Sequence, residues 1–183
     1  MNYIIRKAEI KDAPGVAKVH VKTWQSHYKG QVPDDYLDSL SIEKRTNVWI
    51  KIFSNQKPKT ASFVSGEEGV ILGFCSVGPS RDVGVPHETG ELYSIYLDSS
   101  KQGQGIGSVL MKAGLDFLKE QGFKKATLWV LKTNVKTISF YEARGWKADG
   151  TEMKDEKNGF VFEEIRYSID LWLDPCASNK VSE

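Results

Sequence analysis

Three glycines at alternate positions, Gly103, Gly105 and Gly107, mark the stretch of this sequence that is best suited to bind an anion. They lie between an apolar segment that predicts a strand and an amphipathic segment that predicts a helix. Glycine has no Cβ, so backbone N–H groups at the start of that helix are open to a ligand, and the helix dipole favours negative charge there. The spacing predicts a phosphate or diphosphate site, with an unoccupied connector as the alternative.

Two common phosphate-binding loops do not match this stretch. A dinucleotide-binding loop requires the pattern G-x-G-x-x-G, and the sixth position counted from Gly103 is Ser108. A P-loop requires lysine and then serine or threonine after its last glycine, whereas Gly107 is followed by serine and valine. The loop is therefore predicted to bind phosphate in a third way.

A third pattern does match, because Gln102-x-x-Gly105-x-Gly107 resembles the Q/R-x-x-G-x-G/A motif of the GNAT superfamily of N-acetyltransferases. A predicted strand precedes the motif and a long predicted helix follows it, as in that superfamily. Asn134 and then "FYEARGW" come later, in the order of a second GNAT motif, with tryptophan where phenylalanine is commoner. The similarity is strong over residues 91–150, and the rest of the chain agrees in the order of its elements.

The resemblance implies a fold and a donor. The implied fold is α/β (α+β in layered terms): a mixed, mostly antiparallel sheet of about seven strands, splayed near its middle, with helices on both faces. The implied donor is acetyl-CoA, with its diphosphate on the loop amides and its pantetheine arm along the preceding strand, bound by strand addition. Asn134 would bond the arm or simply cap the next helix. The residues assigned to coenzyme A are Ile95, Leu97, Gln102, Gly103, Gln104, Gly105, Ile106, Gly107, Ser108, Asn134 and Tyr141.

Tyr141 lies in "FYEARGW", where GNAT enzymes commonly place a tyrosine hydroxyl near the sulfur of the donor. The sulfur that departs from a thioester needs a proton donor, and a phenol with a pKa of about 10 keeps its proton at neutral pH. The resemblance therefore assigns Tyr141 as the general acid. The alternative is an aromatic residue of the core, as we expect for its neighbour Phe140.

The attacking amine needs a base, because an amine is mostly protonated at neutral pH. Glu91 lies shortly before the glycine motif, where some GNAT enzymes carry a catalytic glutamate. Strand alternation would place it on one face with Tyr93, Ile95 and Leu97, among apolar neighbours. We predict Glu91 as the base, with Glu88, a histidine or water as alternatives.

The acceptor amine is expected among the first two predicted helices, the variable region of the superfamily. Trp24 and Tyr28 belong to an aromatic set that could line a pocket there, although core packing explains a tryptophan equally well. His20 and His27 are candidates for proton transfer. The sequence leaves the acceptor open among small-molecule amines, such as a metabolite, an antibiotic or a polyamine, and a protein N-terminus or lysine.

Composition argues against several classes of partner. The 183 residues carry a formal net charge of +1 without a basic stripe, which argues against nucleic acid and an anionic membrane surface. No apolar run approaches a membrane span and the first residues lack the apolar core of a signal peptide, so a cytoplasmic protein is expected. Cys75 and Cys176 lie far apart without metal-ligand spacing, so no metal is expected; Cys75 should be buried and Cys176 exposed.

Hydrophobic periodicity predicts one domain over residues 1–174 and a loose tail over 175–183. In its second helical region, which restarts at Ser41, Val48 and Ile52 are expected in the core. The expected elements are a strand over 3–8, helices over 12–28 and 33–53, a hairpin over 60–79, a strand over 88–98, a helix over 102–122, a strand over 124–132, a helix over 134–145, and strands over 145–150 and 159–172.

Together these features predict an N-acetyltransferase that moves an acetyl group from acetyl-CoA to a primary amine by direct attack on the thioester. One alternative is a module that binds coenzyme A without catalysis, as a sensor or scaffold. Another is a nucleotide-binding α/β protein of a different family. A homodimer is common among similar proteins and stays open for this chain.

Overall fold

One continuous sheet organises residues 3–157 and 160–172, the part of the chain that the computed structural model describes. Its seven strands follow the order β1-β2-β3-β4-β5-β7-β6, and each neighbouring pair is antiparallel except β4 with β5. The expected mixed, mostly antiparallel sheet is confirmed. The strands are β1 (Ile4–Lys7), β2 (Ala61–Glu67), β3 (Val70–Pro79), β4 (Thr89–Leu97), β5 (Lys125–Leu131), β6 (Lys147–Lys157) and β7 (Phe160–Asp170).

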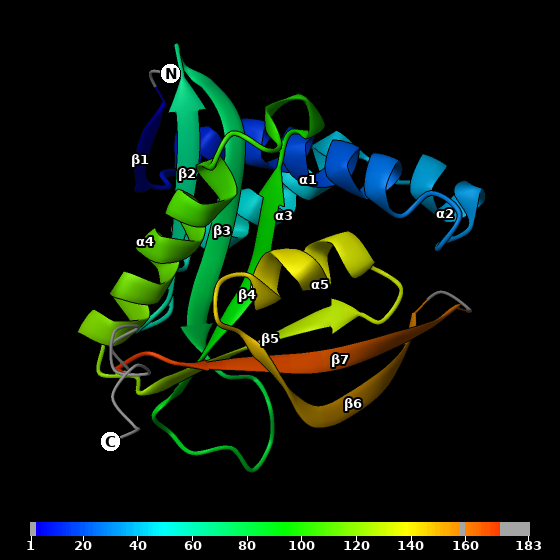
Figure 1. The fold of residues 1–183 in the computed structure, drawn as a ribbon. Helices are drawn as coiled ribbons and strands as arrows, with labels where there is room; N and C mark the ends of the chain where they lie inside the picture. The colour runs from blue at the N-terminus through cyan, green and yellow to red at the C-terminus, as the bar shows by residue number, and fades with distance from the viewer. Residues whose placement is uncertain (1–2, 158–159, 173–183) are drawn as a thin grey trace, which may run out of the picture.

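Helices cover both faces of this sheet, as expected. In Figure 1, α4 and α5 lie in front of the sheet and α1 and α3 lie behind it. Behind the sheet, Val16 of α1 and Trp49 of α3 belong to one core cluster with Phe74 of β3. In front of it, α4 packs on the sheet through Leu110 and Leu118. The helices are α1 (Ala13–His27), α2 (Asp34–Asp38), α3 (Ile42–Ser54), α4 (Ile106–Glu120) and α5 (Val135–Glu142), with 3₁₀ turns at Ile10–Asp12 and Ser99–Lys101.

The sheet opens between β4 and β5. Their parallel pairing joins only Thr89–Glu91 to Lys125–Thr127, and beyond it β4 continues alongside β3 while β5 runs out beneath α5 (Figure 1). Two strands that separate leave backbone N–H and C=O groups without partners in the sheet. The predicted splay between these strands is confirmed, and it exposes the backbone that a ligand could pair with.

β4 has one residue more than β3 close to this opening. Leu92 pairs with Val77 and Ser94 pairs with Ser76, so Tyr93 between them has no partner on β3. An extra residue of this kind is a β-bulge, and it reverses the alternation of side chains along the strand. The face on which a β4 side chain lies therefore depends on which side of the bulge it occupies.

The bulge moves Glu91 away from the face predicted for it. Its neighbours Gly90 and Leu92 face α4, because a Cβ at Gly90 would meet an α4 side chain at 2.9 Å and Leu92 belongs to the core beneath α4. Ile95 and Leu97, beyond the bulge, pack against that same core. The prediction that Glu91 shares a face with Ile95 and Leu97 is wrong, because the extra residue was not visible in the alternation.

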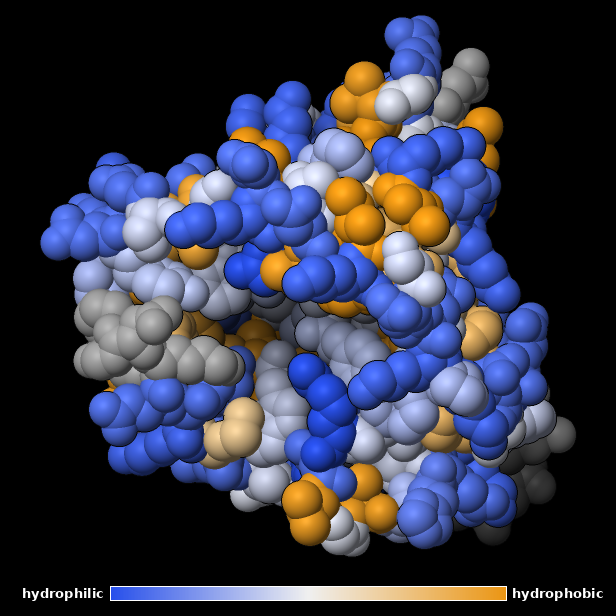
Figure 2. Space-filling model, turned by 180° about the vertical axis from the view of Figure 1, so that it is seen from behind, coloured by the Kyte–Doolittle hydropathy of each residue, from blue (hydrophilic) through white to orange (hydrophobic). Residues whose placement is uncertain are grey.

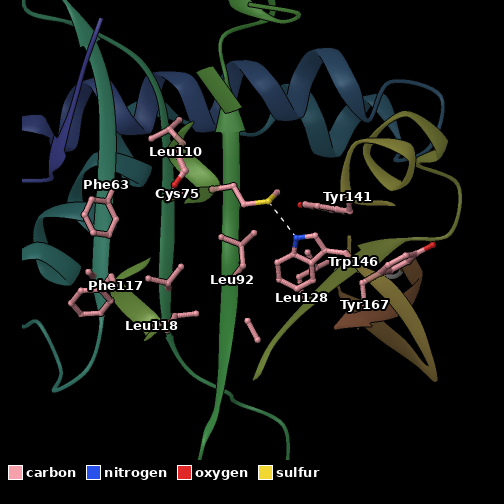
Figure 3. Packing of buried hydrophobic residues seen from close by; sticks show 14 of the residues in the cluster. Phe63, Cys75, Leu92, Leu110, Phe117, Leu118, Leu128, Tyr141, Trp146 and Tyr167 are labelled. Carbon is pink, nitrogen blue, oxygen red and sulfur yellow. Dashed lines mark hydrogen bonds between the residues drawn. The ribbon is translucent and has the colours of Figure 1, made fainter. Parts of the chain in front are cut away.

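Large aromatic side chains close the core beneath α4 and α5 (Figure 3). Trp146, just after α5, is 1% exposed, and its Nε1 donates a hydrogen bond to Sδ of Met111 at 3.3 Å. The ring of Tyr141 lies beside it, with 6.0 Å between the ring centroids. Burying a large apolar side chain stabilises a fold by about 1.5–3 kcal/mol, so this packing holds α5 and its tyrosine in place.

Some predicted core contacts and boundaries are wrong. Val48 and Ile52 are 44% and 43% exposed, because α3 is an outer helix that packs mainly through Trp49 and Phe53. The strand predicted over 145–150 extends through Lys157, since its polar sequence is paired along β7. The predicted tail over 175–183 lies outside the described residues. Within those residues, every helix is too short or too polar to cross a membrane.

Candidate active site

A cavity of about 870 Å³ lies where β4 and β5 separate. One end, here the loop end, is lined by the loop over residues 102–108 and by α5; the other, the hairpin end, is lined by the loop after β3, by β5 and by the β6–β7 hairpin. Figure 2, which views the face of α1 and α3, shows the surface hollowed between the helical part and the sheet. Side chains of α1 also line the cavity.

The glycine loop presents backbone donors at the loop end. Gly103 and Gly105 have φ angles of 74° and 81°, in the left-handed region, and a Cβ at either would meet no atom within 4 Å. Among the described residues, the backbone N–H groups from Gly103 to Gly107 make no hydrogen bond. Unpaired N–H groups that begin a helix next to open space fit a diphosphate.

The side chains of this loop are largely occupied elsewhere. Ile106 is 1% exposed in the core, and Gln104 Nε2 donates to the carbonyl of Ser100 at 3.4 Å. Gln102 lines the cavity, with its Nε2 2.6 Å from Nε2 of His27 at the end of α1. The backbone of the loop, rather than its side chains, is therefore what it offers to a ligand.

Arg144 adds positive charge at the loop end, and the sequence reasoning missed it. Its Nε and Nη2 donate to Oγ of Ser108 at 3.0 and 2.6 Å, and its guanidinium lies 3.7 Å from the ring centroid of Phe140. Lys136 also lines this end, and neither the loop nor α5 adds a carboxylate to the lining that is described. The sequence signal for Arg144 was its position four residues after Phe140, a spacing that places two side chains side by side on a helix.

The part of β4 assigned to the pantetheine arm lines the cavity with backbone that has no β5 partner. Ile95 and Leu97 pair with Cys75 and Gly73 on the β3 side only. Thr23 of α1 donates its hydroxyl to the carbonyl of Leu97 at 3.2 Å. This geometry suits strand addition, which uses backbone groups rather than side chains.

Asn134 lies at the start of α5, where this helix lines the cavity. It is the N-cap of that helix, and its side chain accepts a hydrogen bond from the backbone N–H of Thr137 at 3.3 Å. Its interpretation as a cap is confirmed. Asn134 also lines the cavity, and its contact with a pantetheine arm stays a prediction.

Tyr141 of α5 also lines the cavity. Its side chain is 6% exposed and extends from α5 with the hydroxyl toward β4 (Figure 3). Burial raises the pKa of Tyr141 far above its ordinary value of 10.0, and the nearby phenol of Tyr96 adds to the shift. The hydroxyl is therefore protonated throughout the physiological range, as a proton donor must be.

Glu91 is 1% exposed. The sequence predicted apolar neighbours for it, but its carboxylate is paired with Arg81. Its Oε1 and Oε2 accept from Nε of Arg81 at 3.0 and 3.2 Å, Oε1 also accepts from Nη2, and Oε2 accepts from the backbone N–H of Arg81 at 2.9 Å. A buried carboxylate is stable only when it is paired in this way. The role of Glu91 as a base stays a prediction, and the geometry gives it another task, that of holding Arg81.

Arg81 and Asp82 connect the two arms of the open sheet. Arg81 is bound to Glu91 of β4, whereas Asp82 accepts from Nε1 of Trp129 on β5 at 3.0 Å and from Nη1 of Arg166 on β7 at 2.8 Å. Two adjacent residues of opposite charge thus fasten the loop after β3 to both arms. We call this connection the Arg81–Asp82 bridge.

Trp24 and Tyr28, predicted to bind the acceptor, do line the cavity. Trp24 Nε1 donates to the hydroxyl of Tyr96 at 3.1 Å, and the phenol of Tyr28 is close enough to Tyr96 to influence its pKa. Burial raises the pKa of Tyr28 well above its ordinary value, and Tyr96, Tyr141 and Glu164 contribute in the same direction. Trp24, Tyr28 and Tyr96 therefore form one group in the lining of the cavity, and the binding of an acceptor by Trp24 and Tyr28 stays a prediction.

Most of the alternative bases lie outside the lining of the cavity. Glu88 is 55% exposed and pairs with Lys124 at 2.9 Å, outside the lining. His20 packs among aromatic rings, including that of Tyr96 with 4.9 Å between the centroids, and burial lowers its pKa to about 3. His27 lies at the loop end beside Gln102. Of these residues, only His27 lines the cavity.

The hairpin end contains side chains that the sequence reasoning missed. Trp129, Phe162 and Glu164 line it, from strands β5 and β7. Glu164 lies opposite Leu131 of β5 and opposite Met153 of β6 in the sheet register. Their strands were predicted, but which face of each strand meets the cavity depends on the register, which the sequence did not show.

Cys75 is fully buried and outside the lining of the cavity. Its Sγ donates to the carbonyl of Leu110 at 3.1 Å, and burial raises its pKa to about 12. The expected buried position is confirmed, and a thiol in this state is a poor nucleophile. Cys176 lies outside the described residues.

Comparison with known proteins agrees with the geometry. The model of the acetyltransferase (GNAT) family matches residues 21–146. An uncharacterised N-acetyltransferase of Bacillus subtilis, YuaI, is 36% identical over 139 residues, which are 76% of this chain and 77% of that protein. Spermidine N(1)-acetyltransferase of Thermoplasma acidophilum is 24% identical over 167 residues, 90% of this chain and 98% of that protein.

Solved structures share the fold. A PaiA N-acetyltransferase from Thermoplasma acidophilum, in complex with coenzyme A, has a TM-score of 0.71 at 22% identity, over 93% of this chain and 99% of that one. An N-acetyltransferase from Staphylococcus aureus Mu50 has a TM-score of 0.73 at 22% identity, with the same two coverages of 93% and 99%. With its glycine loop, splayed sheet and matched sequence, this chain is an acyltransferase and belongs to the GNAT family of acetyltransferases.

Proposed function

We propose that this enzyme transfers an acetyl group from acetyl-CoA to a primary amine, which attacks the thioester directly. The observation that carries the assignment is that one cavity is lined by the glycine loop with its unpaired amides, by Tyr141 and by aromatic side chains such as Trp24 and Tyr28. Direct attack is supported by Cys75, the cysteine within the described residues, because it is buried outside the lining.

Coenzyme A fits the loop end in charge and in backbone geometry. The N–H groups from Gly103 to Gly107 would hold its diphosphate, with Lys136 and Arg144 adding positive charge. The free edge of β4 would pair with the pantetheine arm. When bound, acetyl-CoA supplies an acetyl group that is activated as a thioester.

Tyr141 is positioned to give a proton to the departing sulfur. Its raised pKa keeps the phenol protonated at neutral pH, so the hydroxyl would be available to donate a hydrogen bond, and then its proton, to the sulfur as negative charge develops there. Trp146 packs against its ring, so little side-chain freedom is lost when the hydroxyl is used.

The acceptor would approach from the face of α1, where Trp24, Tyr28 and Tyr96 form an aromatic wall. An amine is supported by the relatives, which include a spermidine N-acetyltransferase. A cytoplasmic location and a homodimer stay predictions.

Thiol release from acetyl-CoA tests this assignment. With a panel of primary amines, free thiol should appear only with an acceptor, and mass spectrometry should find one acetyl group added to it. A thermal-shift comparison of coenzyme A with ATP and NAD should show stabilisation by coenzyme A alone. Stabilisation without thiol release for any amine would instead support a sensor or scaffold and overturn the proposed activity.

A further inference from the structure

Arg166 of β7 lies outside the lining of the cavity, yet it is the centre of a network that reaches the hairpin end. Its Nε, Nη1 and Nη2 donate to Oδ2 of Asp149, Oδ2 of Asp82 and Oγ1 of Thr151, each at 2.8 Å. The side chains of Arg166, Asp82 and Asp149 are only 17%, 18% and 16% exposed. A guanidinium presents its donors in a rigid planar fork, so three partners on different segments fix its orientation.

An irregularity in β6 provides two of these partners. Between two regular pairs with β7, the three β6 residues 149–151 lie opposite the single β7 residue Arg166. The middle residue, Gly150, has a φ of 85°, in the left-handed region that glycine adopts without strain. Oδ1 of Asp149 accepts from the backbone N–H of Thr151 at 3.0 Å. Extra residues of this kind re-aim side chains, and here they direct Asp149 and Thr151 at one guanidinium.

The third partner, Asp82, carries the network into the cavity. It lies in the loop after β3 and lines the hairpin end, as does Trp129 of β5. Oδ1 of Asp82 accepts from Nε1 of Trp129 at 3.0 Å, and the guanidinium of Arg166 lies 5.7 Å from the centroid of the Trp129 ring. Arg166 therefore contacts two side chains that face the cavity and restricts how each is oriented.

The electrostatic balance of the network depends on Arg166. The carboxylates of Asp82 and Asp149 bond the same guanidinium, so they lie close to each other. Burial raises the pKa of Asp149, but hydrogen bonds from Thr151 and Arg166 more than offset this, so its pKa lies below the ordinary value of 3.8. Without the guanidinium, two charged carboxylates would repel each other where water screens charge weakly. Asp82 would then move away, and its hydrogen bond with Trp129 would shift or break.

We propose that Arg166 is a positioning residue for the acceptor amine. It holds Asp82 and the indole of Trp129 in the orientation in which they line the hairpin end, and it contacts neither the acceptor nor coenzyme A. This inference rests on the proposed function and deepens it, because it names the group that sets the shape of the acceptor site. Since the network does not include the glycine loop, coenzyme A binding should not depend on it.

Steady-state thiol release at saturating acetyl-CoA measures the effect, with spermidine, tyramine and phenylalanine amide as acceptors. Arg166→Gln leaves two carboxylates uncompensated, so KM for the best of the three should rise at least about tenfold, which corresponds to roughly 1.4 kcal/mol. Arg166→Lys keeps the charge but loses the fork, so KM should rise severalfold. In both variants kcat should change less than KM, and the Kd for coenzyme A should be unchanged in calorimetric titration.

Two further measurements test whether Arg166 acts through its partners. The double variant of Arg166→Gln with Asp82→Asn no longer has two like charges together, so its KM should return to that of Asp82→Asn alone instead of multiplying the two effects. In near-ultraviolet circular dichroism, the difference between the wild type and Trp129→Phe gives the signal of Trp129. Arg166→Gln should lose that signal, because the ring is no longer held in one orientation.

Arg6→Lys is the matched control. Arg6 also binds a carboxylate, that of Asp12, through two nitrogen atoms at 2.6 and 2.8 Å, but both residues lie outside the cavity lining. An equal rise of KM in Arg6→Lys and Arg166→Lys would trace the effect to lost stability and overturn the inference. An unchanged KM in both folded Arg166 variants, or a Kd for coenzyme A that rises as much as KM, would overturn it too, while the proposed function would stand. If the wild type binds coenzyme A but releases thiol with no primary amine, the proposed function fails and this inference fails with it.

Discussion

The two ends of the cavity present different chemical groups, backbone N–H groups at one and side chains at the other. The loop end consists mainly of backbone N–H groups that are contiguous in the sequence, from Gly103 to Gly107. The hairpin end consists of side chains from separate segments, such as Arg81, Trp129 and Glu164. A backbone site requires only a conformation, which a short glycine pattern can specify. A side-chain site requires a register, so the donor could be inferred from a motif and the acceptor could not.

Charge divides the two ends in the same way. The loop end is lined by Lys136 and Arg144 and carries no carboxylate among its described residues, whereas Glu164 and other carboxylates line the hairpin end. A polyphosphate is therefore attracted to one end and repelled by the other. This polarity would orient coenzyme A before any specific contact forms.

The largest effect is expected at the loop end. Gly105→Glu places a side chain and a negative charge in the diphosphate site, so the Kd for coenzyme A should rise at least about 100-fold, or roughly 3 kcal/mol, in calorimetric titration. Gly122→Glu is the matched control, because Gly122 ends the same helix with a similar φ of 86° and lies outside the cavity lining. Equal Kd values for coenzyme A in the two folded variants would show that the loop end does not bind the diphosphate.

The next largest effect is expected from the hydroxyl of Tyr141. Tyr141→Phe should bind coenzyme A normally but lose about 10²–10⁴-fold in kcat, the typical contribution of a general acid, in steady-state thiol release. Tyr167→Phe is the control, since Tyr167 donates to Glu142 at 2.9 Å and does not line the cavity. A kcat for Tyr141→Phe that matches the control would exclude the acid role.

The pH profile sharpens that test. A raised pKa keeps the acid form of Tyr141 populated to higher pH, so the wild-type kcat should not fall on its account below about pH 10. An alkaline decline that begins near neutral pH and persists in Tyr141→Phe belongs to another group.

A smaller effect is expected from the hairpin end. Asp82→Asn weakens the Arg81–Asp82 bridge on its β5 and β7 side, so KM for the acceptor should rise severalfold and the free energy of unfolding should fall by about 1–3 kcal/mol. The Kd for coenzyme A should not change. Asp116→Asn, which breaks an exposed pair with Lys112, controls for the lost charge. If the Kd rises as much as KM, the two ends are not separate.

The smallest effect is expected from a surface contact outside the cavity lining. Thr133, between β5 and α5, donates its hydroxyl to Oε1 of Gln31 at 2.6 Å on the exposed surface. Thr133→Val should change the Kd for coenzyme A by less than about fivefold, or roughly 1 kcal/mol. A larger change in calorimetric titration would show that coenzyme A binding depends on contacts outside the cavity lining.

Most elements followed from the sequence, and the errors have physical causes. Val48 and Ile52 match a helical period but lie on the outer side of α3. The face of Glu91 was predicted wrongly because the bulge at Tyr93 depends on how β3 and β4 pair, which local alternation does not reveal. Arg81 gave no signal as the partner of Glu91, because their approach depends on the path of a loop.

The sequence by itself determined the family, the order of the elements and the glycine loop, because periodicity, caps and glycine spacing act over a few neighbouring residues. It also named Tyr141, which a local motif identifies. Only the tertiary structure decided which carboxylate is neutralised, which faces of β5 and β7 meet the cavity, and that Arg81 and Glu164 share it. Those features depend on side chains brought together from distant segments, and a one-residue shift in register would separate them.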